Sequence, residues 1–537
     1  MSNYSKDMFK QLTEIMERCD KLDNKIADIR EEHKKEITKI KEEHKKEVKV
    51  LNERINILTK ENKELREENK ILKADNTRMK SILSNNSSNT SLPPSKDQKG
   101  KKKSANEYNG RKKSTRKKGG QPGHKGNTLT KEEVKSKIET GEFEHEIIHE
   151  GTPSEKYISK YVVDIKVTVI AKEHRFYPNK NGKIHIPSEY GSNVIYGPNL
   201  KAIAIDLNGE GIVSNERIKE FINTLTDGKL NVSSGSIYEF GKSFQKKISV
   251  LKEQITNEIL NQNTIYTDAT VVTVNGEQKH IRNHSVKNAV YYSYTGSKTI
   301  KNIKEKSLLD KYFGTLVHDH ETALYHFGVQ HGECNAHVQR YLRKTTENTK
   351  HKWSEKLSKL LSKLNDTRNK LMSEGSFFTT RAQKKSEAEY DLILSEGRKE
   401  YEKDKENPLL LNSDENALLK RMVKYKRNHL LFIYDKEVDF TNNRSERDLR
   451  KLKNKQKMSG GFRNEKGCEL FCDILTVIET CKCNNKKILS TLRSIFENKT
   501  PTLIWVGASV LDYKYSPFFF EKIFFKNFCI ILTTYLS

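Results

Sequence analysis

Carboxylates in apolar, strand-like segments are the residues of this chain that point most directly to chemistry. Asp268 lies inside the β-branched run 264–274, and Asp319 ends the short apolar run 314–319. Burying a carboxylate is costly unless it binds a cation or has a partner. Two such residues on neighbouring strands predict a divalent-cation site with hard oxygen ligands.

A third carboxylate, Glu446, lies far downstream in segment 440–450, a predicted helix start that Asn442 and Asn443 could cap. The intervening residues 340–428 are charged, with leucines spaced as on one face of a helix. A helical insertion of this kind would allow Glu446 to return to the two aspartates.

Each carboxylate has an alternative. Asp268 could be a turn residue, although its strand-like surroundings favour the chemical role. Other acidic residues compete with the remaining two positions: Asp310 and Glu321 with Asp319, and Asp439 and Asp448 with Glu446.

Cys334 and His337 follow a histidine-rich stretch and are three residues apart, on one face of a predicted helix. They could bind zinc or another metal that accepts soft ligands. The sequence favours the alternative of packing and one polar bond, because four well-placed ligands are not evident.

The segment 145–149 matches the H-E-x-x-H pattern of zinc proteases. That chemistry needs a helix that places both histidines on one face. Gly141 and Gly151 bracket the segment and its surroundings alternate as in a strand, so we disfavour a protease.

The N-terminal 80 residues contain no proline or glycine and predict a coiled coil. From Leu51 to Met79 an apolar residue recurs every seven positions, with asparagine at three core positions, a pattern that favours two strands. An eleven-residue duplication (31–41 and 42–52) precedes it. We therefore expect residues 1–84 to form a homo-oligomer; a lone charged helix is the alternative.

Residues 85–130 are rich in lysine, glycine and proline and predict a disordered linker. Clustered cations favour contact with the phosphate backbone of nucleic acid over a solvated linker. The residues expected to bind DNA are Lys101, Lys102, Lys103, Arg111, Lys112, Lys113, Arg116, Lys117 and Lys118.

Residues 131–262 predict an α+β region for DNA binding or connection, with strands at 161–171 and 182–186 and short helices between 197 and 238. A helix-turn-helix or a plain helical connector would fit the latter. Residues 263–498 predict an α/β domain with a helical insertion at about 340–430, and 499–537 an atypical apolar tail.

Composition agrees with a polyanion as partner. The 537 residues carry a formal net charge of +27, and only 34% are hydrophobic. Seven irregularly spaced cysteines do not indicate a disulfide framework, and no apolar run is long enough to span a membrane. We expect a cytoplasmic protein without a membrane partner.

In combination these motifs resemble those of DDE transposases of the insertion-sequence sixty-six family, over roughly residues 90–496. The matching stretches are Pro93-Pro94-Ser95, GGQPGHKG at 119–126, YGPNLKA at 196–202, TDAT around Asp268, GTLVHDH around Asp319, Cys334-x-x-His337-x-x-Arg340, FTNNRSERDLR around Glu446 and GGFRN at 460–464.

The resemblance implies an RNase H-like catalytic domain in which Asp268, Asp319 and Glu446 bind two Mg²⁺ ions, with Mn²⁺ as a substitute. It implies cleavage and joining of DNA at element ends and target sites, in the bacterial cytoplasm near the nucleoid, beside accessory proteins of the same element. Arg444, Arg447 and Arg450 would hold DNA phosphates; the alternative is helix-surface arginine.

Two features depart from the family pattern. Many members carry a cysteine-rich zinc segment before the catalytic domain, but residues 131–263 contain no cysteine. The apolar tail matches nothing in the family. A catalytically inactive, DNA-binding coiled-coil remnant is therefore the alternative function, and an RNase H-like nuclease without strand transfer is a third.

Overall fold

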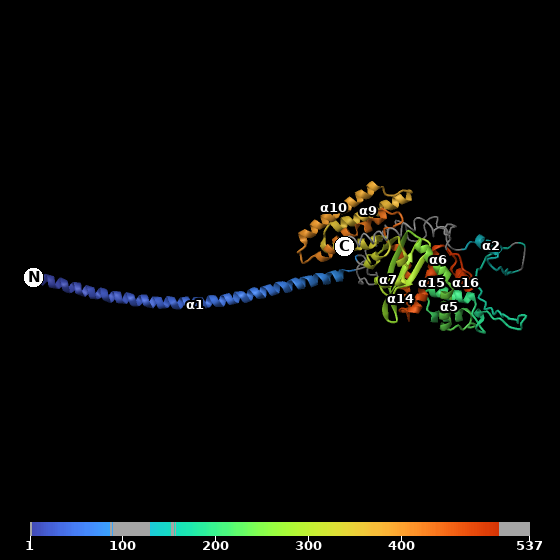
Figure 1. The fold of residues 1–537 in the computed structure, drawn as a ribbon, viewed down its shortest axis with the longest axis horizontal. Helices are drawn as coiled ribbons and strands as arrows, with labels where there is room; N and C mark the ends of the chain where they lie inside the picture. The colour runs from blue at the N-terminus through green and yellow to red at the C-terminus, as the bar shows by residue number, and fades with distance from the viewer. Residues whose placement is uncertain (1–2, 86–88, 90–128, 152–154, 156, 504–537) are drawn as a thin grey trace. The chain divides into compact units, whose positions relative to one another are not determined.

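The computed structural model describes residues 3–85, 89, 129–151, 155 and 157–503 (Figure 1). Contacts divide the chain into two units, one of residues 1–85 with 403–414 and one of all the others. The nine basic residues expected to bind DNA between Lys101 and Lys118 lie outside the described residues, as does the tail from residue 504.

The N-terminal helix α1 (Asn3–Ser84) is continuous over 82 residues, as the absence of proline and glycine predicts. Its heptad residues have no covering partner within the described part of the chain. Leu51 is 60% exposed and Leu65 is 54% exposed. The helix is therefore found where it was expected, and its pairing with a second copy stays a prediction.

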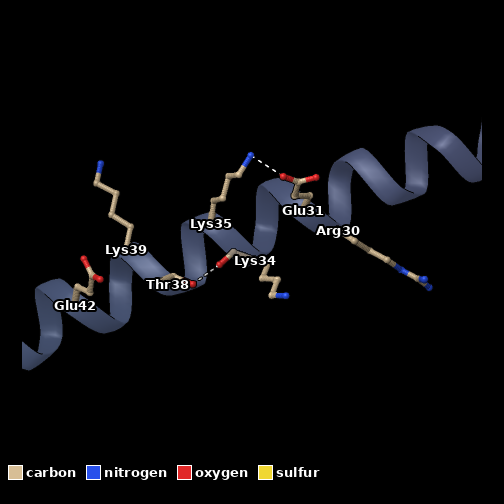
Figure 2. Close-up of a pocket in the computed structure, with 7 residues that line it drawn as sticks. All are labelled: Arg30, Glu31, Lys34, Lys35, Thr38, Lys39 and Glu42. Carbon is tan, nitrogen blue, oxygen red and sulfur yellow. Dashed lines mark hydrogen bonds and ion pairs between the residues drawn. The ribbon is translucent and has the colours of Figure 1, made fainter.

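A shallow hollow on α1 is formed by side chains that all come from this one helix (Figure 2). Lys35 Nζ lies 2.9 Å from Glu31 Oε1, and the Thr38 hydroxyl donates to the Lys34 carbonyl oxygen at 2.7 Å. Exposed ion pairs of this kind contribute little stability. The hollow is part of a solvated helix surface and not a candidate site.

The region before the sheet is helical, with α2 (Lys131–Glu139), η2 (Ser188–Tyr190), α3 (Pro198–Gly209), α4 (Asn215–Leu225), α5 (Ser234–Lys247) and α6 (Ser249–Leu260). The short helices predicted after residue 197 are confirmed. Ser214 and Ser233 each cap the following helix by accepting a backbone N–H bond.

The strand predicted at 161–171 is wrong, and the described residues of 131–262 form no strand. Residues 157–177 form no helix or strand, and residue Ile184 makes only an isolated bridge with Pro178. Val162 is 94% exposed and Ile165 is 87% exposed. β-Branched composition is not sufficient for a strand, because a strand needs a partner and a surface to cover.

A five-stranded sheet is the centre of the described structure. The strands are β1 (Thr264–Val274), β2 (Glu277–Ser285), β3 (Val290–Tyr294), β4 (Thr315–His318) and β5 (Gln330–Glu333), in the order β3-β2-β1-β4-β5. The pairs β1–β2 and β2–β3 are antiparallel, and β1–β4 and β4–β5 are parallel. Asn275 and Gly276 both have positive φ and close the β1–β2 hairpin, as is typical of an Asn-Gly turn.

Two faces of the sheet bury different cores, because alternate side chains on a strand point to opposite sides. Ile265 and Leu316 pack with helices α3 to α6 and with the closing helices α15 (Glu465–Cys483) and α16 (Ile488–Phe496). Their neighbours Tyr266 and Val317 pack on the other side, with the helices that follow β5.

Helices predominate in the insertion between β5 and Glu446, as the leucine spacing predicts. They are α8 (Asn335–Thr349), α9 (Trp353–Ser373), α10 (Thr380–Asp404), α11 (Asn412–Lys424), α12 (Lys426–Leu430) and η5 (Leu431–Ile433). After the insertion the chain forms α13 (Asn443–Asp448) and α14 (Arg450–Ser459). Three short helices lie between the strands of the sheet: α7 (Ile300–Lys306) and η3 (Leu309–Lys311) precede β4, and η4 (Thr322–His326) precedes β5. No described helix combines the length and apolarity needed to cross a bilayer.

Helices α9 and α10 meet closely where Trp353 faces Gly397. A Cβ atom on Gly397 would lie 2.6 Å from Trp353 Cγ, and the indole is fixed because its Nε1–H donates to Glu415 Oε1 at 2.6 Å. We expect Gly397→Ala to lower the free energy of unfolding by about 1–3 kcal/mol, despite the better helix propensity of alanine. Thermal unfolding followed by circular dichroism measures this change.

The matched control is Ser395→Ala, at an exposed position of the same helix. It should leave the unfolding temperature unchanged or raise it slightly. Equal unfolding temperatures for Gly397→Ala and Ser395→Ala would contradict the close contact between Gly397 and Trp353.

Candidate metal centre

Neighbouring parallel strands place Asp268 and Asp319 side by side. Tyr266 on β1 is the register partner of Val317 on β4. Continuing this register by two places sets Asp268, in the middle of β1, beside Asp319, which directly follows the last residue of β4. The structure thus brings together the two aspartates that the sequence singled out.

The same register continues into the third parallel strand. His318 on β4 pairs with Glu333 on β5, so the next position sets Cys334 beside Asp319. Cys334 directly follows β5 and is the N-cap residue of α8, and His337 lies in the first turn of that helix. The predicted i, i+3 pair is therefore directed to the same sheet end as the aspartates.

Glu446 reaches this end through α13, whose start is held by a buried asparagine. The Asn442 side-chain amide donates to the Thr267 carbonyl oxygen on β1 at 2.9 Å, and the Asn442 backbone N–H donates to Cys334 Sγ at 3.2 Å. Asn442 occupies the N-cap position of α13 as predicted, but its side chain makes no capping bond and its Nδ2 is bound to β1 instead. The bond positions the helix that carries Glu446 against the strand that carries Asp268.

Asn283 on β2 joins the same two elements from the other side. Its Oδ1 accepts from the Asp268 backbone N–H at 3.2 Å and from the Ser445 hydroxyl at 2.6 Å. Its Nδ2 donates to the Ser445 carbonyl oxygen at 3.1 Å. This fully buried amide therefore fixes the backbone beside both Asp268 and Glu446.

Four ligand atoms come together at this sheet end. One atom each of Asp319, Cys334, His337 and Glu446 lies within 4.8 Å of all the others. His337 Nδ1 is 2.9 Å from Asp319 Oδ1 and 4.0 Å from Glu446 Oε1. Asp268 is not one of these four, but the charges of Asp319 and Glu446 act on it.

Burial and the negative charge of Asp319 raise the pKa of Asp268 to about 7, and Glu446 adds to the effect. The Ala269 backbone N–H donates to Asp268 Oδ1 at 2.7 Å, and this hydrogen bond acts in the opposite direction by lowering the pKa of Asp268. Burial alone would lower the pKa of His337, but its contacts with Asp319 and Cys334 raise it. A divalent cation would relieve this accumulation of negative charge.

Each competing acidic residue is held elsewhere. Glu321 forms ion pairs with the buried Arg282 and with Lys298. Asp448 accepts from the Ser285 hydroxyl at 2.7 Å. The remaining two, Asp310 and Asp439, lie beside Lys304 and Arg368 respectively and outside the group of four ligand atoms.

The predicted arginines are not equivalent. Arg444 lies over the Tyr266 ring at 5.3 Å, and Arg447 is largely exposed. Both line a groove with Arg368 of α9, which we call the Arg368 groove; it also contains Asn365, Asn369, Asp439, Phe440, Thr441 and Asn443. Arg450 is exposed at the start of α14 and does not line this groove. No local signal in the sequence marks Arg368, because only the fold brings α9 to Glu446.

A buried carboxylate next to Cys334 connects the insertion to the sheet. Glu333 lies 2.6 Å from an Arg421 guanidinium nitrogen and 2.8 Å from His320 Nδ1, and it also accepts from the Tyr325 hydroxyl. Burial alone would raise the pKa of Glu333, but hydrogen bonds from His320 and His429 hold it well below the ordinary range. Helices α11 and α12 are thereby attached beside Asp319.

The H-E-x-x-H segment does not form a metal site in the structure. Residues 142–150 contain no helix, and His145 and His149 are both exposed. The helix that would place both histidines on one face is therefore not formed by these residues.

Comparison with known proteins gives one family. Residues 193–470 match the family model described as Transposase IS66 family, which is just over half of the chain. The matched range contains Asp268, Asp319, Cys334, His337 and Glu446 but begins after the GGQPGHKG motif. A search of curated proteins found no match to the chain.

Removal of the Asn283 amide tests how the centre is positioned. We expect Asn283→Ala to weaken Mn²⁺ binding about tenfold or more, because partners of metal ligands typically contribute this much. Calorimetric titration of the purified chain measures the affinity. Gln278→Ala, at an exposed position of the same strand, should bind as the wild type does. Equal affinities for all three proteins would refute the positioning role.

Proposed function

The chain belongs to the Transposase IS66 family, and from this premise we propose that it binds the ends of a mobile DNA element and catalyses metal-dependent cleavage and strand transfer. The observation that carries the proposal is the meeting of Asp268, Asp319 and Glu446 at one end of the sheet. The first two are set side by side by strand register, and the third arrives through the helix that Asn442 and Asn283 hold.

We propose further that the sheet is that of an RNase H-like domain. Three antiparallel strands followed by two parallel ones, in the order β3-β2-β1-β4-β5, support this assignment. So do the helical insertion between β5 and α13 and the position of Asp268 on the central strand β1, beside Asp319 after β4.

Asp268, Asp319 and Glu446 would hold two divalent cations, Mg²⁺ in the cell with Mn²⁺ as a substitute. The donor set fits, because Asp319 Oδ1 and Glu446 Oε1 are buried carboxylate oxygens without a hydrogen-bond partner. Bound cations would activate the attacking oxygen and stabilise the leaving oxygen of an in-line displacement.

The chain's own contribution is to position the reacting groups. Asn283 and Asn442 fix the backbones of Asp268 and Glu446, so the carboxylates need little reorganisation when cations and DNA bind. The Arg368 groove adjoins α13, where Arg444 and Arg447 would hold phosphates close to Glu446. Orientation of this kind supplies much of the catalysis of phosphoryl transfer.

The other segments would bring DNA and a second copy to this domain. The 82-residue α1, with its apolar heptad positions exposed, supports oligomerisation through residues 1–84. Clustered lysines and arginines support DNA contact by the linker 85–130. We propose residues 131–262 as a connector or DNA-binding region, 263–498 as the catalytic domain and 499–537 as a separate tail.

Replacing the carboxylates tests the proposed chemistry. Asp268→Ala, Asp319→Ala and Glu446→Ala should each lower Mg²⁺-dependent cleavage of labelled element-end DNA by about a thousandfold or more, because each removes a cation ligand. DNA affinity should fall little or not at all. Gel analysis of nicked and joined products, with a parallel binding assay, measures both.

Asp310→Ala is the matched control, because this exposed aspartate lies on η3 and outside the group of ligand atoms. It should cleave as the wild type does. Nicking without joining would favour a nuclease, and binding without cleavage by the wild type, even with the element's accessory proteins, would favour an inactive remnant.

The Arg368 groove gives a second prediction. Arg444→Gln and Arg447→Gln should each reduce the slope of log affinity against log salt by about one, since each removes one phosphate contact. Fluorescence anisotropy across a salt series measures the slope. Arg398→Gln, at an exposed position of α10, should keep the wild-type slope. Unchanged slopes in both groove variants would exclude the groove from DNA binding.

A further inference from the structure

We propose that Cys334 and His337 join Asp319 and Glu446 in a binding site for a borderline divalent cation of the Zn²⁺ class. The site shares two carboxylates with the Mg²⁺ site of the proposed function, and its consequence for that site rests on the proposed function. Because one carboxylate pair cannot fully serve both, the two kinds of cation would compete.

The distances are close to those of a four-coordinate site. Zinc bonds of about 2.0–2.3 Å place neighbouring ligand atoms of a tetrahedron about 3.2–3.8 Å apart. The observed separations from His337 Nδ1 are 2.9 Å to Asp319 Oδ1 and 4.0 Å to Glu446 Oε1, and all four ligand atoms lie within 4.8 Å of one another. Side-chain shifts of less than about an ångström would complete the tetrahedron.

A buried oxygen without a hydrogen-bond partner supports the site in addition to these distances. Glu446 Oε1 is buried and makes no hydrogen bond, and its neighbours Asp319 Oδ1 and His337 Nδ1 have only each other, as an ion pair at 2.9 Å. Buried polar atoms are rarely left without a partner, so Glu446 Oε1 beside this ion pair points to a ligand.

Cys334 is placed to act as a thiolate ligand. It is 1% exposed, it occupies the N-cap position of the 15-residue helix α8, and its Sγ accepts the Asn442 backbone N–H. A helix N-terminus stabilises negative charge on sulfur. The side chains of Asp319 and Glu446 are 30% and 28% exposed, so a cation can enter from their side.

Ligand type distinguishes this site from the oxygen-only site of magnesium. Thiolate and imidazole favour Zn²⁺ and Co²⁺ over Mg²⁺, which prefers oxygen. Asp268 is not among the four ligands, so a cation bound here would occupy Asp319 and Glu446 without completing the two-cation arrangement. The predicted effect is that such a cation occupies the centre in an unproductive form.

Cobalt titration of the full-length, chelator-treated chain tests the site through its absorption spectrum. Wild type should develop thiolate-to-cobalt charge-transfer absorption with the visible bands of a four-coordinate ion, and Zn²⁺ should abolish both. Cys334→Ser should lose the charge-transfer band, and His337→Gln should bind cobalt about tenfold or more weakly. Excess Mg²⁺ should weaken cobalt binding to the wild type.

Cys483→Ser is the matched thiol control, because Cys483 is exposed and distant in sequence from the cluster. It should keep the wild-type spectrum. The absence of the charge-transfer band in wild type, or its persistence in folded Cys334→Ser, would overturn the inference. If Cys334→Ser does not fold, by circular dichroism, an unchanged cobalt affinity of His337→Gln would overturn it instead. None of these readouts depends on DNA cleavage, so loss of the proposed function would leave them interpretable.

Discussion

Electrostatic repulsion among Asp268, Asp319 and Glu446 is the interaction that the surrounding structure has to oppose. Burial and the charges of Asp319 and Glu446 raise the pKa of Asp268 to about 7, whereas the contact with His337 lowers the pKa of Asp319 despite its burial. Left free, such side chains would separate. They stay together because strand register fixes the two aspartates, and because buried amides attach α13 to β1 and β2. The energy of this arrangement comes from backbone hydrogen bonds and packing, and a bound cation would recover the electrostatic cost.

The layers of the fold follow from the same requirement. Helices α3 to α6 with α15 and α16 cover one face of the sheet, and the insertion covers the other, so β1 and β4 are buried on both sides. Rigid strands can then hold side chains at their carboxyl ends with little freedom. Glu333 adds a second attachment, because its contacts with Arg421 and His320 bind the insertion to the strand end next to Asp319. The insertion thus has a structural connection to the site as well as a contribution to the Arg368 groove.

The centre also combines two ligand types that usually serve different cations. Oxygen ligands of Asp268, Asp319 and Glu446 suit magnesium, and the sulfur and imidazole of Cys334 and His337 suit zinc-like cations. They converge because β4 and β5 end at the paired residues His318 and Glu333, so Asp319 and Cys334, the residue that precedes α8, come next in the same register. In a chain of the Transposase IS66 family, the metal available at the site would therefore bear on its proposed DNA chemistry as much as the protein's own residues do.

Local patterns in the sequence determined a large part of this structure. The heptads predict α1, the residues 264–274 predict β1, Asn275 and Gly276 predict its hairpin, and the leucine spacing predicts the insertion, because each signal acts between residues close in the chain. The β-branched composition of 161–171 predicted a strand that does not form, since nothing pairs with that segment among the described residues. The four-residue β5, with its His331, Gly332 and Glu333, carries no periodic signal at all. Only the tertiary structure decided that Asn283, Arg368 and Cys334 belong beside the carboxylates, because their contacts join segments from 15 to over 160 residues apart, and no local pattern encodes such a distance.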